Sequence, residues 1–342
     1  MRPRHQSSVD NDFILKILDK DAPRALIGKL HADARRLTDE VFGRDVYARG
    51  LIEITNVCRN NCLYCGIRSG NTSVSRYTLS TEQIVSSCRT AHSAGLRSFV
   101  LQGGENPALT ADRIESIVRE ISSEFPDSAI TLSLGEWDDN AIQRFREAGA
   151  TRYLLRHETR SETHYLRLHP ESMSLHNRLR CLRTLKRTGY QTGTGMMIGT
   201  PFQTLGNIIE DIDFMRELQP EMIGIGPFIP ADNTPFATFP AGSVELTLRL
   251  ISVLRLIFPK ANIPATTALA TLDPTRGRIA GLNAGANVVM PNISPPDARN
   301  AYRLYDNKAA FGLESIDGID GLARSLAESG FNLSFDRGDY RG

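Results

Sequence analysis

The feature that most constrains the fold is an alternation of eight short apolar runs with longer amphipathic segments. The short runs have the length and composition of buried strands, and the longer segments have the period of helices. Eight β/α units at this spacing predict an α/β fold, a complete (β/α)8 TIM-type barrel of parallel strands. The predicted strands are YARGLIEIT (47–55), RSFVLQG (97–103), AITLSLG (129–135), TRYLLRHE (151–158), TGTGMMIG (192–199), MIGIGPF (222–228), NIPATTAL (262–269) and NVVMPN (287–292).

Helix signals fill the stretches between these strands. Ser80 is an N-cap type residue with an acidic residue two positions later, and it predicts a helix that ends at Gly95. Asp138 predicts the start of another helix, which ends at Gly149. A doubly wound open sheet would give a similar alternation. The barrel is favoured because the chain lacks a GxGxxG fingerprint; its nearest match, at 193–198, has no third glycine.

The arrangement of these signals divides the chain into three predicted parts. Residues 1–44 form an N-terminal helical extension, with helices at roughly 11–19 and 23–41. Residues 45–305 form the barrel, and residues 306–342 form a C-terminal helical tail packed on it. No internal low-complexity linker splits the chain.

Charge and hydropathy exclude several classes of partner. Formal net charge is +1, from 40 basic and 39 acidic residues, so no overall field favours nucleic acid or a membrane surface. No run of about 18 apolar residues occurs, and the arginines near the N-terminus are not followed by an apolar segment. We therefore expect a cytoplasmic protein whose partner is a small molecule.

Three of the five cysteines are crowded into one loop. Cys58, Cys62 and Cys65 form a C-x3-C-x2-C pattern, and no histidine lies within 25 residues of Cys65. A structural zinc ion needs four ligands, whereas three thiolates can bind three irons of a cubane cluster and leave the fourth iron open to a small molecule. A zinc site with a distant fourth ligand and three unrelated buried cysteines are the alternatives.

Unusual polar residues follow the first four predicted strands, where barrel enzymes place their active sites. Besides the cysteine loop, these are Gly103-Gly104-Glu105, the stretch 133–136 and the end of the fourth strand. Along that fourth strand side chains alternate, so one face carries Arg152, Leu154, Arg156 and Glu158. Burying these charges is costly unless they bind a ligand or one another, so a zwitterionic cofactor and an internal ion-pair network are both open.

Four histidines lie in one stretch of the chain but are not predicted to hold a second metal. No two of them have the i, i+4 spacing that lets helical histidines share an ion. We expect surface or capping roles for His157, His164, His169 and His176.

The cysteine spacing, with Tyr64 before the last cysteine, resembles the signature of the radical SAM superfamily. Gly103-Gly104-Glu105 resembles its GGE motif, in which a strand-end turn meets the ammonium of a bound methionine. The resemblance implies that S-adenosylmethionine binds the open iron and is cleaved to a 5′-deoxyadenosyl radical. Two glycines that let the backbone approach a ligand, and a carboxylate suited to a cation, fit that role.

Longer strings are similar to one family, the FeFe-hydrogenase maturases of the HydE type, which are relatives of biotin synthase and methylornithine synthase. Together the strings span most of residues 45–305. They are NVCRNNCLYCGIR, TLSLGEW (131–137), RYLLRHET (152–159), the segment around Asn177-Arg178-Leu179, GIGPFIP (224–230), NIPATTA (262–268) and AGANVVMPN (284–292).

The family resemblance implies a role for particular residues. The cysteines at 58, 62 and 65 would hold one 4Fe-4S cluster. The S-adenosylmethionine pocket would be formed by Tyr64, Gly104, Glu105, Ser133, Arg156, Glu158 and Arg178. The substrate cavity would be lined by Arg152, Thr266, Thr267, Met290 and Tyr305.

The resemblance also implies an enzyme of hydrogenase H-cluster assembly that acts on a cysteine-ligated iron complex with carbon monoxide and cyanide ligands. Implied partners are other hydrogenase maturation proteins and a reductant such as ferredoxin or flavodoxin. The tail 306–342 has no cysteine, so we predict a single cluster. A methylornithine synthase-like enzyme and a non-catalytic iron-sulfur scaffold or carrier are the alternatives.

Overall fold

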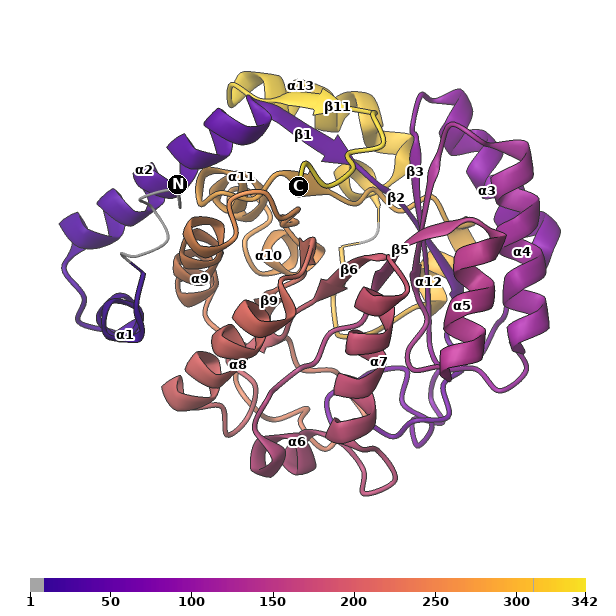
Figure 1. The fold of residues 1–342 in the computed structure, drawn as a ribbon, viewed down its shortest axis with the longest axis horizontal. Coiled ribbons are helices and arrows are strands. Elements are labelled where there is room, and N and C mark those ends of the chain that lie inside the picture. The colour runs from indigo at the N-terminus through magenta and orange to yellow at the C-terminus, as the bar shows by residue number, and fades with distance from the viewer. Residues whose placement is uncertain (1–8, 310) are drawn as a thin grey trace.

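A parallel sheet surrounded by helices forms the centre of the molecule (Figure 1). The computed structural model describes residues 9–309 and 311–342. Six strands pair in the order β2-β3-β4-β5-β6-β8, all parallel. They are β2 (Gly50–Thr55), β3 (Ser98–Gly103), β4 (Ala129–Ser133), β5 (Ala150–Leu154), β6 (Gln191–Thr194) and β8 (Met222–Ile223).

Helices cover the outer face of this sheet, so its strands are buried on both faces. All six residues of β2 are buried, as expected for a parallel strand between a helical layer and the sheet interior. The covering helices are α3 (Thr81–Ser93), α4 (Ala111–Glu124), α5 (Asp139–Ala148), α7 (Leu175–Arg187), α8 (Leu205–Leu218) and α9 (Val244–Ile257) (Figure 1). Helix α6 (Glu162–Leu168) lies beyond the end of the sheet, where its Leu168 carbonyl accepts from the Leu63 N–H.

Local capping explains where several helices begin. The Ser80 side chain accepts from the Gln83 N–H in a complete capping box, and Asp138 accepts from the Ala141 N–H. At the end of α5, Gly149 has φ 122°, a conformation that favours glycine. These starts and stops match the helices that the sequence predicts.

The first predicted helices are also present. They are α1 (Asn11–Leu18) and α2 (Arg24–Phe42), and α2 packs against α9. The first eight residues of the predicted 1–44 extension lie outside the described residues. The division into 1–44, 45–305 and 306–342 stays a prediction.

Several predicted strands are shorter than the sequence pattern suggests. The run 47–55 divides into β1 (Asp45–Ala48) and β2, the run 192–199 into β6 and β7 (Met197–Ile198), and the run 222–228 into β8 and β9 (Gly226–Pro227). Between the last two pairs, Gly195 approaches Gly224 so closely that a Cβ atom would lie 2.0 Å from the Gly224 carbonyl oxygen. The close approach lies between the β6–β8 pair and the β7–β9 pair.

The predicted strand at 262–269 is wrong as a strand. Pro264 has no N–H to donate to a ladder, and helix α10 (Thr267–Leu272) begins inside the predicted run. Isolated parallel bridges remain, pairing Asn262 with Met222 and Pro264 with Val288. The next segment contains β10 (Val288–Val289), and its Asn292 bridges Leu51 of β2. The continuous hydrogen-bonded ladder therefore has six strands, and single bridges span the rest.

The C-terminal region contains more than the predicted helix. After α11 (Gly277–Asn283) and α12 (Pro296–Ala301) come 3-10 turns at Gly312–Glu314 and Ile316–Gly318, and then α13 (Ile319–Glu328). Strand β11 (Asn332–Ser334) then pairs with β1 in parallel (Figure 1). In the part of the chain that the structure describes, no helix is both long and apolar enough to cross a membrane.

Candidate functional site

A cavity of about 330 Å³ lies at the carboxyl ends of the strands. Its walls come from the cysteine loop, the ends of β3 to β5, helix α7, and the segments after β9 and α12. All but one of the residues predicted for the cluster, the cofactor pocket and the substrate cavity line it, and the exception is Arg152. The structure therefore brings together residues that are up to 247 positions apart, from Cys58 to Tyr305.

The cysteine loop is fixed by backbone hydrogen bonds rather than by regular secondary structure. The Arg76 guanidinium donates to four carbonyl oxygens of this loop, at 2.6 to 2.8 Å. The Leu63 N–H donates to the Leu168 carbonyl at 2.9 Å. Gly66 packs so tightly that a Cβ atom would lie 2.1 Å from the Arg303 carbonyl oxygen. These contacts fix the backbone conformation of the loop.

The three cysteines of the loop are free, half-buried thiols. Burial raises the pKa of Cys58 and Cys62, and it raises the pKa of Cys65 to about 12. Thiolates that share one zinc ion lie about 4 Å apart, given a Zn–S bond of about 2.3 Å. In residues 9–309 and 311–342, no three His, Cys, Asp or Glu side chains are grouped as for a single ion. A metal ion or cluster bound by these thiols would stabilise their deprotonated form.

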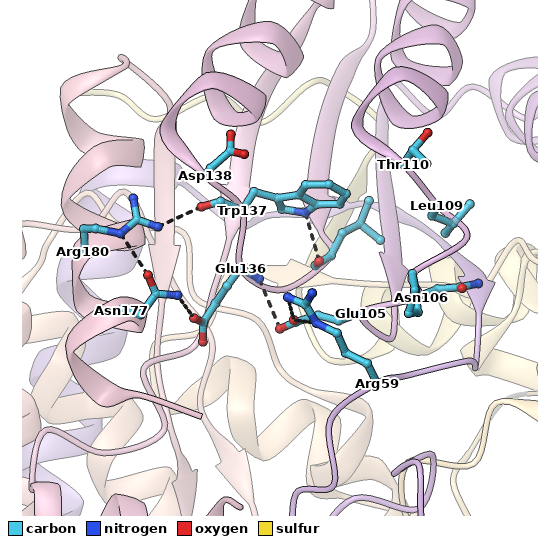
Figure 2. A pocket seen from close by; sticks show the side chains of 12 residues that line it. Arg59, Glu105, Asn106, Leu109, Thr110, Glu136, Trp137, Asp138, Asn177 and Arg180 are labelled. Atoms are coloured by element: carbon cyan, nitrogen blue, oxygen red, sulfur yellow. Dashed lines mark hydrogen bonds and ion pairs between the residues drawn. The ribbon is translucent and has the colours of Figure 1, made fainter. Parts of the chain in front are cut away.

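Glu105 connects the cysteine loop with the next strand-end loops. Gly104 lets β3 end against the loop, since a Cβ there would lie 2.4 Å from the Val57 carbonyl oxygen. The Glu105 carboxylate accepts from Arg59 Nη2 at 2.9 Å and from the Glu136 N–H at 3.2 Å. Figure 2 shows this arrangement, with Arg59 facing Glu105. The pairing of Arg59 with Glu105 was not predicted from the sequence.

Glu105 also forms part of the wall of a second, adjoining cavity of about 440 Å³. This cavity lies between the starts of α4 and α5 and helix α7, with the Trp137 indole on one side and Arg59 on the other (Figure 2). Arg180 and Asn177 of α7 are hydrogen-bonded to each other at 3.0 Å on its wall. Glu105 thus lies between the two cavities.

The segment after β5 presents Arg156 and Glu158 to the main cavity. Arg156 Nε donates to Glu158 Oε1 at 2.8 Å, while Glu158 Oε2 is buried without a hydrogen-bond partner among the described residues. Glu158 has φ 66°, an unusual conformation for a non-glycine residue. A strained backbone and an unsatisfied buried carboxylate oxygen together mark this position as a candidate ligand-binding site.

His157 points away from the cavity and fixes this segment from behind. It is fully buried, with Nδ1 2.9 Å from Thr194 Oγ1 and Nε2 3.3 Å from Asp211 Oδ1. His164 and His169 are also buried. The prediction of surface or capping roles is therefore wrong for His157 and His164. His169 has a capping role, because it is the C-cap residue of α6 and its Nδ1 lies 3.1 Å from the Tyr165 carbonyl oxygen. His176 is exposed.

Arg178 of α7 reaches the cavity wall through three different contacts. Its Nη2 lies 2.9 Å from Glu136 Oε1, and its Nη1 donates to the Arg156 carbonyl at 2.9 Å. Its Nε donates to the Tyr165 hydroxyl at 3.2 Å. Arg178 therefore ties together the loops after β4 and β5, and its side chain is nearly buried while it still lines the cavity.

The structure corrects the placement of Arg152. Its side chain is fully buried, and its guanidinium donates to Ser98 Oγ, the Arg337 carbonyl and Asp339 Oδ1 at 2.9, 2.6 and 2.8 Å. Arg152 precedes Arg156 by four residues, about 13 Å along a strand, so it lies nearer the opposite end of the sheet. The internal ion-pair alternative applies here, and its acidic partner comes from the C-terminal segment.

The remaining wall consists of the residues predicted for the substrate side, Thr266, Thr267, Met290 and Tyr305. Thr266 Oγ1 is buried without a hydrogen-bond partner among the described residues. Burial raises the pKa of the Tyr305 hydroxyl. Lys308 also lines the cavity, although the sequence did not predict it as a site residue. The only sequence signal for it is proximity to Tyr305.

Comparison with known proteins gives one family match and several relatives. Residues 52–215 match the model of the Radical SAM superfamily. The FeFe hydrogenase maturase subunit HydE of Thermotoga maritima is 45% identical over 294 residues, which cover 86% of this chain and 82% of that protein. The 3-methylornithine synthase of Methanosarcina barkeri is 32% identical over 298 residues, covering 85% of this chain and 81% of that protein.

Solved structures are similar over nearly the whole chain. The crystal structure of methylornithine synthase (PylB) has a TM-score of 0.84 at 28% identity, covering 95% of this chain and 94% of that chain. The crystal structure of HydG, a maturase of the FeFe hydrogenase, has a TM-score of 0.80 at 17% identity, covering 96% of this chain and 73% of that chain. The second likeness concerns the fold alone.

Proposed function

The chain belongs to the radical SAM superfamily and to the family of the FeFe hydrogenase maturase subunit HydE, and we propose that it acts in assembly of the hydrogenase diiron subsite. It is an enzyme of the radical SAM type, whose cofactors are a 4Fe-4S cluster and S-adenosylmethionine. The observation that carries the proposal is a single cavity lined by Cys58, Cys62, Cys65, Glu105, Glu158 and Arg178.

The residues present fit these cofactors. Three free thiols on the cysteine loop face the cavity, and burial raises their pKa, so binding to iron would stabilise their thiolates. Around them the cavity offers acidic and basic groups together, as a zwitterion requires. The unsatisfied Glu158 Oε2 is a ready acceptor for a hydroxyl or ammonium group. The three cysteines would hold the cluster and leave one iron open.

When bound, the reduced cluster supplies the electron that cleaves S-adenosylmethionine to a 5′-deoxyadenosyl radical. The chain's own residues orient the cofactor and exclude water. Arg178, buried and supported by Glu136 and Tyr165, would bind the methionine carboxylate. Glu105 would accept from the methionine ammonium, in competition with Arg59. Tyr64, Ser133 and the pair Arg156–Glu158 would complete the pocket on the adenosyl side.

We also propose that the eight β/α units close into a complete barrel. Support comes from backbone hydrogen bonds beyond the six-stranded ladder. The Ile223 N–H donates to the Asn262 carbonyl, the Ala265 N–H to the Val288 carbonyl, and the Ile293 N–H to the Leu51 carbonyl, at 2.8 to 2.9 Å. These bonds lead from β8 through the seventh and eighth units back to β2.

The proposed substrate is a cysteine-ligated iron complex with carbon monoxide and cyanide ligands. Its support is the 45% identity to a hydrogenase maturase subunit and the hydroxyl-rich wall formed by Thr266, Thr267 and Tyr305. A methylornithine synthase-like amino-acid radical enzyme is the second candidate, favoured by the TM-score of 0.84 to that enzyme. Proposed partners are other maturation proteins and a ferredoxin- or flavodoxin-type reductant. Free cysteines favour a reducing, cytoplasmic setting.

A spectroscopic experiment tests the cofactor assignment and separates the enzyme from a scaffold or carrier. The anaerobically reconstituted, reduced protein is examined by electron paramagnetic resonance with and without S-adenosylmethionine. Direct contact of the cofactor with the open iron predicts a changed spectrum. An unchanged spectrum from a protein with full iron content would favour a non-catalytic scaffold.

A further inference from the structure

The segment from Tyr302 to Lys308, here called the strap, crosses one side of the main cavity. Tyr302, Leu304, Tyr305 and Lys308 line the cavity from this segment. The Gly66 N–H of the cysteine loop donates to the Leu304 carbonyl at 2.8 Å. After the strap, the Ala309 N–H donates to Thr271 Oγ1 at 3.2 Å. The strap is therefore attached both to the cysteine loop and to α10.

Lys308 forms a buried ion pair with Glu53 of β2. The Glu53 side chain is 0% exposed and the Lys308 side chain 8%. Glu53 Oε2 also accepts from Asn292 Nδ2 at 2.8 Å. Burial raises the pKa of the Glu53 carboxyl, and the nearby Lys308 ammonium opposes that rise. Glu53 does not line the cavity, whereas Lys308 does, so the lysine is the member of the pair that a ligand can reach.

The Lys308 ammonium has hydrogen-bonding capacity to spare. An ammonium carries three donors. Among the described residues its hydrogen-bond acceptors are Glu53 and, at 3.5 Å, the Tyr302 carbonyl, and the ammonium also lies 5.0 Å from the centre of the Tyr302 ring. At least one of its donors therefore has no hydrogen-bond acceptor in the described part of the chain. Thr266 Oγ1, on the same cavity, is also buried without a partner. Two unsatisfied polar groups on one cavity indicate a polar ligand that bonds to both.

The other cationic residues on this wall already have acidic partners. Arg156 pairs with Glu158 and Arg178 with Glu136, and the proposed function assigns both arginines to S-adenosylmethionine. Lys308 is the third cationic residue on the described wall, and it belongs to the strap, three residues after Tyr305 on the cavity that Thr266 also lines. Its own counter-ion, Glu53, does not line the cavity, so a ligand in the cavity meets the lysine and not the glutamate.

We propose that Lys308, supported by Glu53, binds the carboxylate of an amino-acid part of the substrate. This inference rests on the proposed function, since it concerns the substrate of the same cavity. A carboxylate would supply the hydrogen-bond acceptor that the Lys308 ammonium lacks, and it would also accept from Thr266 Oγ1. A charge-assisted contact of this kind strengthens binding by about tenfold or more.

Binding of two small thiols tests the inference. L-cysteine and cysteamine differ only in the carboxylate, and calorimetry measures their affinity for the anaerobic protein loaded with cluster and S-adenosylmethionine. We expect the wild type to prefer L-cysteine about tenfold or more, and Lys308→Met to lose that preference. Lys260→Met, at an exposed lysine remote from the cavity, is the matched control and should keep it.

Removing Lys308 alone leaves Glu53 buried without its partner, which can impair folding. The double variant Glu53→Gln/Lys308→Met removes both charges and keeps the test valid, with iron content as the measure of correct assembly. A preference for L-cysteine retained in either variant, or absent from the wild type, would overturn the inference. If the preference behaves as expected but no 5′-deoxyadenosine forms, the proposed function fails while the carboxylate site stands.

Discussion

Buried arginines lie near both ends of the sheet, but they have different surroundings. Near the amino ends of the strands, Arg49 and Arg152 are covered by the C-terminal segment, whose Gly338 carbonyl and Asp339 carboxylate accept from them. At the carboxyl ends, the buried Arg178 and the half-buried Arg156 line an open cavity. Burial of charge is thus common to both ends, and only the second end leaves room for a ligand.

A buried charge thus indicates a binding site only when a hydrogen-bonding atom beside it is left without a partner at a cavity. Arg152 Nη1 and Nη2 bond to the protein itself, and its Nε is buried without a partner among the described residues, but Arg152 does not line the cavity. Burial lowers the pKa of this arginine, while Asp339 opposes that fall. Near Arg156, Glu158 Oε2 has no partner in the described structure and faces the cavity wall. Residues near the amino ends of the strands should therefore govern stability, and residues at the carboxyl ends should govern cofactor binding.

The largest expected effect is at the carboxyl ends. Cys62→Ala removes one of three cluster ligands, so we expect loss of the iron-sulfur cluster and of all S-adenosylmethionine cleavage. Cys88→Ala, in the core of the protein, is the matched control and should keep its iron. Iron analysis and detection of 5′-deoxyadenosine give the result, and cleavage by Cys62→Ala with normal iron content would contradict the cluster assignment.

The next effect separates cofactor binding from cluster assembly. Arg178→Ala should weaken S-adenosylmethionine binding by about tenfold to a hundredfold, the range for loss of a charge-assisted contact, while iron content stays normal. Arg183→Ala, on the same helix but exposed and paired with Glu217, serves as the control. Equilibrium binding measures both. An unchanged dissociation constant for Arg178→Ala would remove this residue from the pocket.

A smaller effect is expected at the amino ends of the strands. Asp339→Ala leaves Arg152 without its carboxylate partner, so the free energy of unfolding should fall by about 1–3 kcal/mol, with no change in S-adenosylmethionine affinity. Glu328→Ala, at an exposed acid of the same C-terminal region, should change neither. Urea unfolding provides the measurement. A weakened cofactor affinity in Asp339→Ala would contradict the division of roles between the two ends.

The smallest expected effect is the pH dependence of the difference in unfolding free energy between the wild type and Asp339→Ala. Arg152 and Arg337 hold the pKa of Asp339 well below its usual range against the opposing effect of burial. A lowered folded-state pKa stabilises the protein above the unfolded value of about 4, and this contribution is lost as pH falls toward the folded value. The wild type should therefore exceed Asp339→Ala most at neutral pH and progressively less below pH 4. A constant difference down to pH 2 would show that the carboxylate charge is not the cause.

Local signals in the sequence were sufficient to predict much of this fold. Ser80 and Asp138 predict helix starts because a cap bonds to residues three positions away. The run 262–269 was wrong as a strand because the absence of a proline N–H and a nearby helix start outweighed its apolar pattern. Long-range contacts were not predictable in this way, since the pairing of Arg152 with Asp339 joins residues 187 positions apart.

The candidate site shows the same limit. The cysteine spacing and the family strings predicted most of the cavity wall, because those residues follow strands in an ordered way. Arg152 was misplaced since strand periodicity gives the face of a side chain but not its depth in the sheet. Lys308 was missed because its importance depends on Glu53, which precedes it by 255 positions.

The most direct test of the account is 5′-deoxyadenosine formation by the anaerobically reconstituted, reduced protein, with and without a cysteine-ligated iron carbonyl cyanide complex. The proposed function predicts slow cleavage of S-adenosylmethionine alone and strong stimulation of that cleavage by the complex. Cleavage that the complex does not stimulate would contradict the proposed substrate, and no cleavage by a protein with an intact cluster would contradict a catalytic role.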